Sequence, residues 1–197
     1  MVEISRRQAI EDVASELFRE HGYAGTSIRD IARALSVQGA SLYAHVTSKE
    51  DVLWAIVDRA ATRFERAADA AESNAEVTHP GDPVEALAEL VRAHVDVLTR
   101  DVGEASVFVH EWRALGAGRR DQILERRDAY QARFRRRIED GIAVGGFAMT
   151  DPAVATNTLL SAMNGLATWY DPAGRLGADR IADHNVDLML RMLEASR

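Results

Sequence analysis

The chain has 197 residues, 47% hydrophobic and 28% charged, with a formal net charge of −7. This composition is typical of a soluble globular protein that needs no covalent staples to fold. The absence of cysteine excludes disulfides, thiolate catalysis and cysteine-based metal sites. No apolar run approaches the roughly 18 residues of a membrane span, and the N-terminus has no secretory pattern, so we expect a cytoplasmic protein.

Residues 1–50 are expected to form three helices. A capping box at Ser5 begins the first helix, whose apolar side chains recur at helical spacing until Gly22 ends it. Thr26 caps a second helix from Ser27 to about Leu35. A four-residue turn follows, and a third short helix runs from about Gly39 to His45, which is the arrangement of a helix-turn-helix.

The remaining sequence predicts one long connecting helix and a bundle. Ser48 begins a helix expected to reach about Ala71, and the polar segment Ser73–Pro83 is predicted to be a linker. Breaks at proline and glycine separate five further helices, at about 84–100, 104–115, 119–144, 152–169 and 178–195. We therefore expect an all-α fold of about nine helices. Residues 1–50 form the DNA-binding domain, and residues 51–197, with the connecting helix at 51–71, form a domain for ligand binding and dimerisation.

The candidate DNA contacts lie on the second and third helices and beside them. Leu42 would anchor the third helix inward, so that its other face can enter the major groove. Gln38 suits adenine and Ala40 a thymine methyl, while Tyr43 and Lys49 suit phosphate oxygens. The free amides of the second helix offer a further phosphate site. The candidate DNA-binding residues are Thr26, Ser27, Arg29, Gln38, Ala40, Ser41, Tyr43, His45 and Lys49.

Neither charge nor spacing identifies DNA as the partner. The first 50 residues hold six basic and seven acidic side chains, and the rest of the chain holds 18 and 24. Binding would therefore require cations gathered on one face. A helix-turn-helix spacing also occurs in helical proteins that do not bind DNA, with Tyr43 in the core and Lys49 simply solvated.

A longer run of residues carries a family resemblance. From residue 7 to residue 54, without gaps, the chain contains His21-Gly22-Tyr23, Thr26-Ser27-Ile28-Arg29-Asp30-Ile31-Ala32, Leu42-Tyr43 and Ser48-Lys49-Glu50-Asp51-Val52-Leu53. This pattern resembles the DNA-binding domain of the TetR family of bacterial one-component repressors, which implies DNA binding and a dimeric all-α fold. The chain has Gly39-Ala40 where the family often has Lys-Gly, which removes one expected phosphate contact. It also has His45-Val46 where the family often has Tyr-Phe.

The last two predicted helices, 152–169 and 178–195, are candidates for a homodimer interface. Both are rich in Ala, Ser and Leu, so they can pack closely against their symmetry mates. A two-fold dimer of this kind matches a palindromic operator. The alternative is that these apolar stripes are buried within one chain.

Apolar and aromatic side chains of the middle helices are candidates for an effector site, although each is also compatible with ordinary core packing. They are Phe64, His94, Phe108, Trp112, Tyr130, Phe134, Met163, Asn164 and Trp169. The segments Glu111-Trp112-Arg113-Ala114-Leu115, Gly145-Gly146-Phe147 and Met163-Asn164-Gly165 look like the TetR subgroup that controls fatty-acid, sterol or aromatic-acid catabolism. That resemblance implies an acyl-CoA thioester as the effector.

An arginine-rich stretch, Arg126–Arg137, makes the helix at 119–144 strongly cationic. Its side chains are expected either to pair with acids of the same helix on a solvated face, or to anchor the phosphates of an anionic ligand.

Motifs for catalysis are missing. The sequence has no phosphate-binding Gly-Lys loop, no nucleophile elbow and no His-Glu-x-x-His, and its one Glu-x-x-His, at Glu76–His79, lies in the predicted linker. We expect no enzyme activity, no cofactor and no metal. The function expected is a DNA-binding repressor released by a small molecule, and the alternative is a helical ligand-binding or scaffold protein that does not bind DNA.

Overall fold

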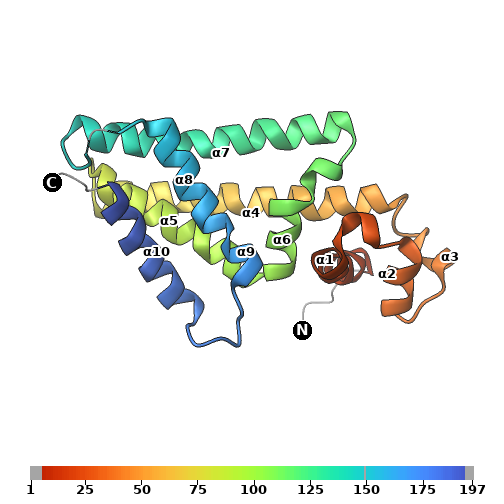
Figure 1. The fold of residues 1–197 in the computed structure, drawn as a ribbon. Coiled ribbons are helices and arrows are strands. Elements are labelled where there is room, and N and C mark those ends of the chain that lie inside the picture. Colours follow the sequence, from red (N-terminus) through yellow and green to blue (C-terminus); the bar gives the residue numbers. More distant parts are fainter. Residues whose placement is uncertain (1–5, 149, 194–197) are drawn as a thin grey trace. The chain divides into compact units, whose positions relative to one another are not determined.

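The computed structural model describes residues 6–148 and 150–193 (Figure 1). This part of the chain contains helices and no strand, which confirms the expected all-α fold. Its elements are α1 (Arg6–Gly25), α2 (Ile28–Ala34), α3 (Gly39–Leu42), α4 (Lys49–Thr78), α5 (Pro83–Arg100), α6 (Val102–His110), the 3₁₀ turn η1 (Trp112–Ala114), α7 (Ala117–Ala143), α8 (Pro152–Asn164), α9 (Leu166–Trp169) and α10 (Ala178–Leu193). None of these helices combines the length and apolar character needed to span a membrane.

The chain divides into two compact units. The first consists of the chain up to Ala61 together with Asp101–Leu124, and the second of Thr62–Arg100 together with the chain from Glu125 onward. The expected domain boundary after residue 50 gave α6 and the start of α7 to the C-terminal domain. In the structure these elements lie with the N-terminal helices.

In the first unit, α1 packs against α2 and α6, and α2 packs against α3. The core of this unit includes the completely or almost completely buried side chains of Ile10, Phe18, Ile31, Leu42 and Leu53. Gly22, with φ of 73°, kinks the chain where the sequence predicted that the first helix ends. One further helical turn follows before α2.

In the second unit, α5 packs against α8, α9 and α10, and α10 also contacts α8 (Figure 1). The largest buried side chains of this core include Leu87, Leu90, Leu98, Phe134 and Ile138. Asp82 begins α5 as predicted, because its carboxylate accepts hydrogen bonds from the amides of Val84 and Glu85 while Pro83 occupies the first helical position.

The prediction that Ser73–Pro83 forms a linker is largely wrong. Residues 73–78 continue α4, and the reason is a buried alanine stripe, Ala68, Ala71 and Ala75, that keeps the helix packed beyond the predicted end. The hydroxyl of Thr78 donates to the carbonyl of Asn74 in the last turn. Only the short turn before Asp82 separates α4 from α5.

Three other predicted helices differ in extent. The third helix ends at Leu42 rather than His45, because the amides of His45 and Val46 both donate to the Leu42 carbonyl in a turn. The helix expected at 104–115 begins at Val102, ends at His110 and is followed by η1, and the one at 152–169 is interrupted at Gly165. The cap at Ser48 is present, with Oγ accepting from the Asp51 amide, whereas Ser5 and residues beyond 193 lie outside the described residues.

Candidate nucleic-acid interface and buried aromatic site

The turn between α2 and α3 orients the second helix of the pair. The amides of Ser36 and Val37 donate to carbonyls of Arg33 and Ala32, and Ser36 takes the left-handed conformation with φ of 55°. Leu42 is then 1% exposed and Ile31 is fully buried, so α3 turns its apolar side inward. This is the orientation that the sequence predicts.

The outward side of this segment is polar and accessible. Arg29, Gln38, Ser41 and His45 are exposed, and Tyr43 is 60% exposed although it is aromatic. Gln38 stands at the N-cap of α3 without a capping hydrogen bond from its side chain, which leaves its amide group available. The structure therefore brings these five candidates together on the surface of one unit, while the side chain of Ala40 is not described.

Ser27 and Thr26 have local structural roles. The Ser27 hydroxyl accepts from the Asp30 amide and donates to its carboxylate, closing a capping box. The hydrogen bonds that the Ser27 hydroxyl and the Ser27 amide donate to the Asp30 carboxylate lower the pKa of Asp30. Thr26 is 3% exposed, its hydroxyl donates to the carbonyls of Leu17 and Gly22, and its amide donates to Tyr23. The expected phosphate contact from Thr26 is thus corrected, because both donors are used inside the fold.

Lys49 also differs from the expectation. Its Nζ donates to the carbonyl oxygens of Tyr23 and Thr26, at 2.7 and 2.8 Å, and lies 4.1 Å from the centre of the Tyr23 ring. Burial also raises the pKa of the Tyr23 phenol. The ammonium group therefore ties the start of α4 to the segment between α1 and α2, which uses two of its three N–H groups. The phosphate contact expected of Lys49 stays a prediction.

A charged cluster that the sequence analysis missed lies in the same unit. The guanidinium of Arg59 on α4 pairs with Glu11 and Asp12 on α1 and with Glu104 on α6. The side chains of Glu11 and Glu104 are only 8% and 3% exposed. Acids at positions 11 and 104 on otherwise apolar helix faces were the available indication, but their shared partner is distant in sequence.

Four of the nine candidate effector residues form one aromatic cluster in the second unit. The His94 ring on α5 lies 5.0 Å from Phe64 on α4, and 5.8 and 6.0 Å from Tyr130 and Phe134 on α7, measured between ring centres. Nδ1 of His94 is 3.0 Å from the Tyr130 hydroxyl oxygen. Burial is the main cause that lowers the pKa of His94 to about 3, and the Asn164 side chain opposes it only in part.

The other candidates are distributed differently. Met163 is fully buried on α8 of the second unit, next to Asn164 in the sequence. Phe108 and Trp112 are buried in the first unit. Trp169 is 60% exposed at the end of α9, so it does not line the aromatic cluster.

The arginine-rich stretch pairs mainly across helices. Arg126 binds Glu65 on α4, Arg133 binds Asp69 and Glu72, and Arg137 binds Glu72 and Asp140. These three arginine side chains are only 25–26% exposed. Of the expected partners within α7, Glu139 pairs with Arg135 and Asp140 with Arg137. The main partners on α4 were not foreseen, and they leave these three arginines committed to carboxylates.

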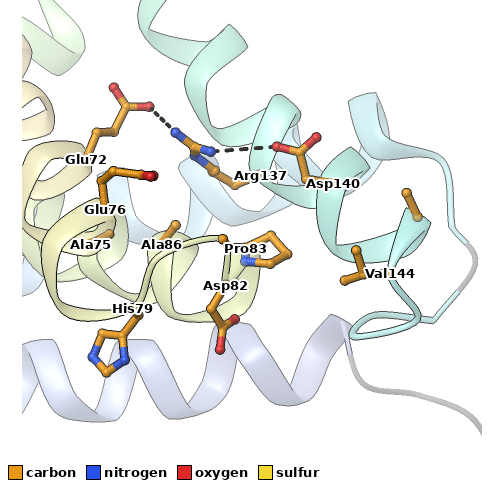
Figure 2. A pocket seen from close by; sticks show the side chains of 12 residues that line it. Glu72, Ala75, Glu76, His79, Asp82, Pro83, Ala86, Arg137, Asp140 and Val144 are labelled. Atoms are coloured by element: carbon orange, nitrogen blue, oxygen red, sulfur yellow. Dashed lines mark hydrogen bonds and ion pairs between the residues drawn. The ribbon is translucent and has the colours of Figure 1, made fainter.

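A surface cavity of about 280 Å³ opens elsewhere in the second unit, where the end of α4, the start of α5 and the end of α7 meet (Figure 2). Its lining includes Glu72, Glu76, Asp82, Asp140 and Arg137, and none of the candidate effector residues. In Figure 2 the Arg137 guanidinium bridges Glu72 and Asp140 at one side of the cavity. Among the described residues no group of His, Asp and Glu could hold a metal ion.

Family comparisons identify the chain. The model for bacterial regulatory proteins of the tetR family matches residues 10–56, and the model for the tetracyclin repressor-like C-terminal domain matches residues 80–193. The chain belongs to the TetR family. The resemblance noted in the sequence is thereby confirmed, as is the expectation of a transcriptional regulator rather than an enzyme.

Several TetR-family relatives match over nearly the whole chain. The repressor KstR2 of Mycolicibacterium smegmatis is 25% identical over 192 residues, covering 94% of this chain and 89% of its own. The structure of PfmR from Thermus thermophilus superposes with a TM-score of 0.81 at 31% identity, covering 95% of this chain and 99% of its own. AibR, solved in complex with isovaleryl coenzyme A and operator DNA, has a TM-score of 0.78 at 29% identity, covering 96% and 98%.

Proposed function

We propose that this TetR-family regulator is a homodimeric repressor that binds a palindromic operator and leaves it when an acyl-CoA thioester binds. The observation that carries the proposal is the polarity of α3 and its flanks, where Leu42 is buried while Gln38, Ser41 and Tyr43 face outward. A helix of this kind presents its first residues to base edges in the major groove. A cytoplasmic location is part of the proposal, since the operator is there.

The DNA contacts divide by chemistry. Gln38 and Ser41, with Ala40 as a methyl contact to thymine, would meet base edges. Arg29, Tyr43 and His45, together with the N-terminal end of α2 at Ser27, would meet the phosphates and fix the register. Lys49 would act indirectly, because its ammonium holds the backbone before α2 in place.

A second copy of the chain is the proposed partner of α8, α9 and α10. Large apolar side chains lie exposed there, with Val154 at 61%, Trp169 at 60%, Leu188 at 59% and Met192 at 42%. Leu188 and Met192 are one helical turn apart and share a face of α10. A two-fold dimer covers the same face of both subunits and sets the spacing of two half-sites.

The effector is proposed to bind at the aromatic cluster of Phe64, His94, Tyr130 and Phe134, with Met163 and Asn164 as further candidates. Apolar walls with few polar groups are typical of small-molecule sites. The acyl-CoA class is supported by the isovaleryl coenzyme A complex of AibR. An effector can release DNA only if it binds the DNA-incompetent state more tightly. We propose that this state differs in α4, which contributes residues to both units.

The test is operator binding by fluorescence anisotropy, using labelled duplexes from the region upstream of the protein's own gene and, if these fail, a selection from random sequences. We expect tight, salt-sensitive binding that is released by acyl-CoA thioesters. Tyr43→Ala should lower the affinity for every duplex, whatever its sequence, roughly three- to tenfold. Gln38→Ala should instead relax preference at one base pair.

The exposed Arg100, on α5, gives a control, because Arg100→Ala removes a positive charge from the second unit and leaves the unit that contains the helix-turn-helix unchanged. Its affinity for operator should match the wild type. Failure to bind any selected duplex would contradict the repressor function and favour a helical ligand-binding protein that does not touch DNA. Binding that no thioester relieves would retain the repressor and reject the effector class.

A further inference from the structure

His94 carries one ring nitrogen that has no well-formed hydrogen bond to a described residue. The side chain is 3% exposed, and its Nδ1 lies 3.0 Å from the Tyr130 hydroxyl oxygen. Nε2, on the other edge of the ring, is buried and makes no hydrogen bond of ordinary length and angle with a described residue, and the Asn164 side chain is the one polar neighbour whose hydrogen bonding favours the protonated ring. Buried polar atoms are nearly always paired in folded proteins, so this nitrogen calls for an explanation.

The bond to Tyr130 indicates which nitrogen carries the proton. Burial raises the pKa of Tyr130, so its phenol stays protonated, and within the described part of the chain its hydroxyl has no other hydrogen-bond partner. If Tyr130 donates to Nδ1, only the Nε2–H group is left over. If Nδ1–H donated to Tyr130, both the phenol hydrogen and the Nε2 lone pair would be left over. The first arrangement leaves fewer unsatisfied groups, so we assign the hydrogen to Nε2.

The surroundings make this group a neutral donor. Burial lowers the pKa of His94 to about 3, which keeps the imidazole uncharged at physiological pH. Phe64 and Phe134 stand against the ring at 5.0 and 6.0 Å. A carboxylate or phosphate placed here would lose its hydration, and the positive charges of Arg127 and Arg133, which act on His94 and Tyr130, would offset that cost only in part. A carbonyl oxygen loses much less, and a single N–H satisfies it.

We propose that Nε2–H of His94 donates a hydrogen bond to a neutral carbonyl oxygen of the effector, which in an acyl-CoA is the thioester oxygen. This inference rests on the proposed effector function and adds the polar contact that orients the ligand. Tyr130 is the positioning residue, because its hydroxyl fixes the tautomer of the imidazole. Binding would give the ring donor the well-formed hydrogen bond that it lacks among the described residues.

The ligand test compares isovaleryl coenzyme A with S-(3-methylbutyl) coenzyme A, a thioether that lacks only the carbonyl oxygen. Each is titrated into the complex of the full chain with operator duplex, and the concentration for half-maximal release is measured. The wild type should require roughly 2- to 10-fold less of the thioester, as expected for one neutral hydrogen bond. In His94→Phe the two compounds should become equivalent, and His94→Gln, which keeps a donor, should retain part of the preference.

Phe64→Leu provides the matched control, since it alters packing against the ring without removing the donor. In this variant the concentration for half-maximal release should rise for both compounds by the same factor, so that the ratio of the two concentrations is unchanged. The tautomer is tested on the free wild-type chain by long-range ¹H–¹⁵N NMR of its histidines, so the result does not depend on how a variant folds. We expect the Nε2-protonated form of His94, unchanged between pH 5 and pH 8.

The outcomes separate this inference from the proposed function. Release by both compounds at equal concentration in the wild type would overturn the carbonyl contact and leave the acyl-CoA repressor intact. Release by neither would overturn the effector class and the inference with it. An Nδ1-protonated ring would overturn the inference whatever the release data show.

Discussion

Lys49 illustrates how a residue proposed to contact DNA can have a structural task. Its two hydrogen bonds go to backbone carbonyls 23 and 26 residues away in sequence. Local spacing shows a cation at the start of a helix but cannot show which carbonyls will lie within its reach. The same holds for Thr26, whose hydroxyl closes the kink after Gly22.

Lys49→Ala should lower the stability of the fold as well as operator affinity. Two carbonyl oxygens would lose a charged donor, which costs about 1–3 kcal/mol in the free energy of unfolding. Urea denaturation of the full chain measures it. Arg29→Ala, at an exposed position of α2, is the control and should change stability by no more than about 0.5 kcal/mol. Equal stability of the two variants would contradict the structural role of Lys49.

His94 should make the protein sensitive to mild acid. Its pKa is about 3 when folded and 6.5 as the ordinary value, so below pH 6.5 the unfolded chain binds a proton that the folded chain does not. Stability from this residue is present above pH 6.5 and is lost as the pH falls toward 3. Between pH 7 and pH 5 the loss is about 2 kcal/mol.

Comparing the wild type with His94→Phe by chemical denaturation at both pH values isolates this effect, because the carboxylates titrate in both proteins. The variant should be less sensitive over that interval. A wild type and variant with parallel pH profiles would show that His94 is not held neutral.

At the scale of elements, the sequence predicts helical periodicity and most caps, although Ser27 and not Thr26 caps α2. It predicts poorly which helices pair with one another. Asp82 and Asp151 correctly predict where α5 and α8 begin, because a helix start at Asp-Pro is a purely local pattern. The continuation of α4 through residues 73–78 was missed because its buried stripe consists of alanines, which carry little apolar weight in a polar segment. The partners of Arg126 and Arg133 were missed because they lie on another helix.

Near the end of α7, Gly141 lies in close contact with the ring of Phe147. A Cβ added at Gly141 would lie 2.2 Å from Cδ2 of Phe147, a ring that is 5% exposed. Gly141→Ala should therefore destabilise the fold by about 1–2 kcal/mol, the strain of overpacking less the gain in helix propensity. Gly118→Ala in the same helix meets no atom within 4 Å and should leave stability unchanged or slightly raised. Equal unfolding temperatures for Gly141→Ala and Gly118→Ala would disprove the close contact between Gly141 and Phe147.

At the scale of the whole molecule, the sequence foresaw an all-helical regulator with a helix-turn-helix, but not how the chain divides. α6 and the first residues of α7 belong with the N-terminal helices, through α1–α6 packing and the Arg59 cluster. A boundary drawn along the sequence cannot represent a unit built from two separate segments. The exposed apolar side chains of α8 to α10 lie in the two segments that the sequence offered for a homodimer interface because they are rich in Ala, Ser and Leu.

Leu188→Glu should convert the proposed dimer into a monomer with its helical content unchanged. A buried carboxylate at the interface would be desolvated without a partner, whereas in the monomer it is solvated. Light scattering after size-exclusion chromatography gives the mass, and operator affinity should fall with it. Val77→Glu, at an 81% exposed position on α4, should remain dimeric. A Leu188→Glu protein of unchanged mass would place the interface elsewhere.

Lys49 is the only lysine in the chain, and every other basic side chain apart from histidine is an arginine. Thioesters transfer acyl groups to free amines, but they do not acylate guanidinium groups under mild conditions. The one side-chain amine of this protein is hydrogen-bonded to two carbonyls within the fold. Acylation of Lys49 by an amine-reactive reagent thus requires the amine to leave these two carbonyls, and its rate reports how often that occurs.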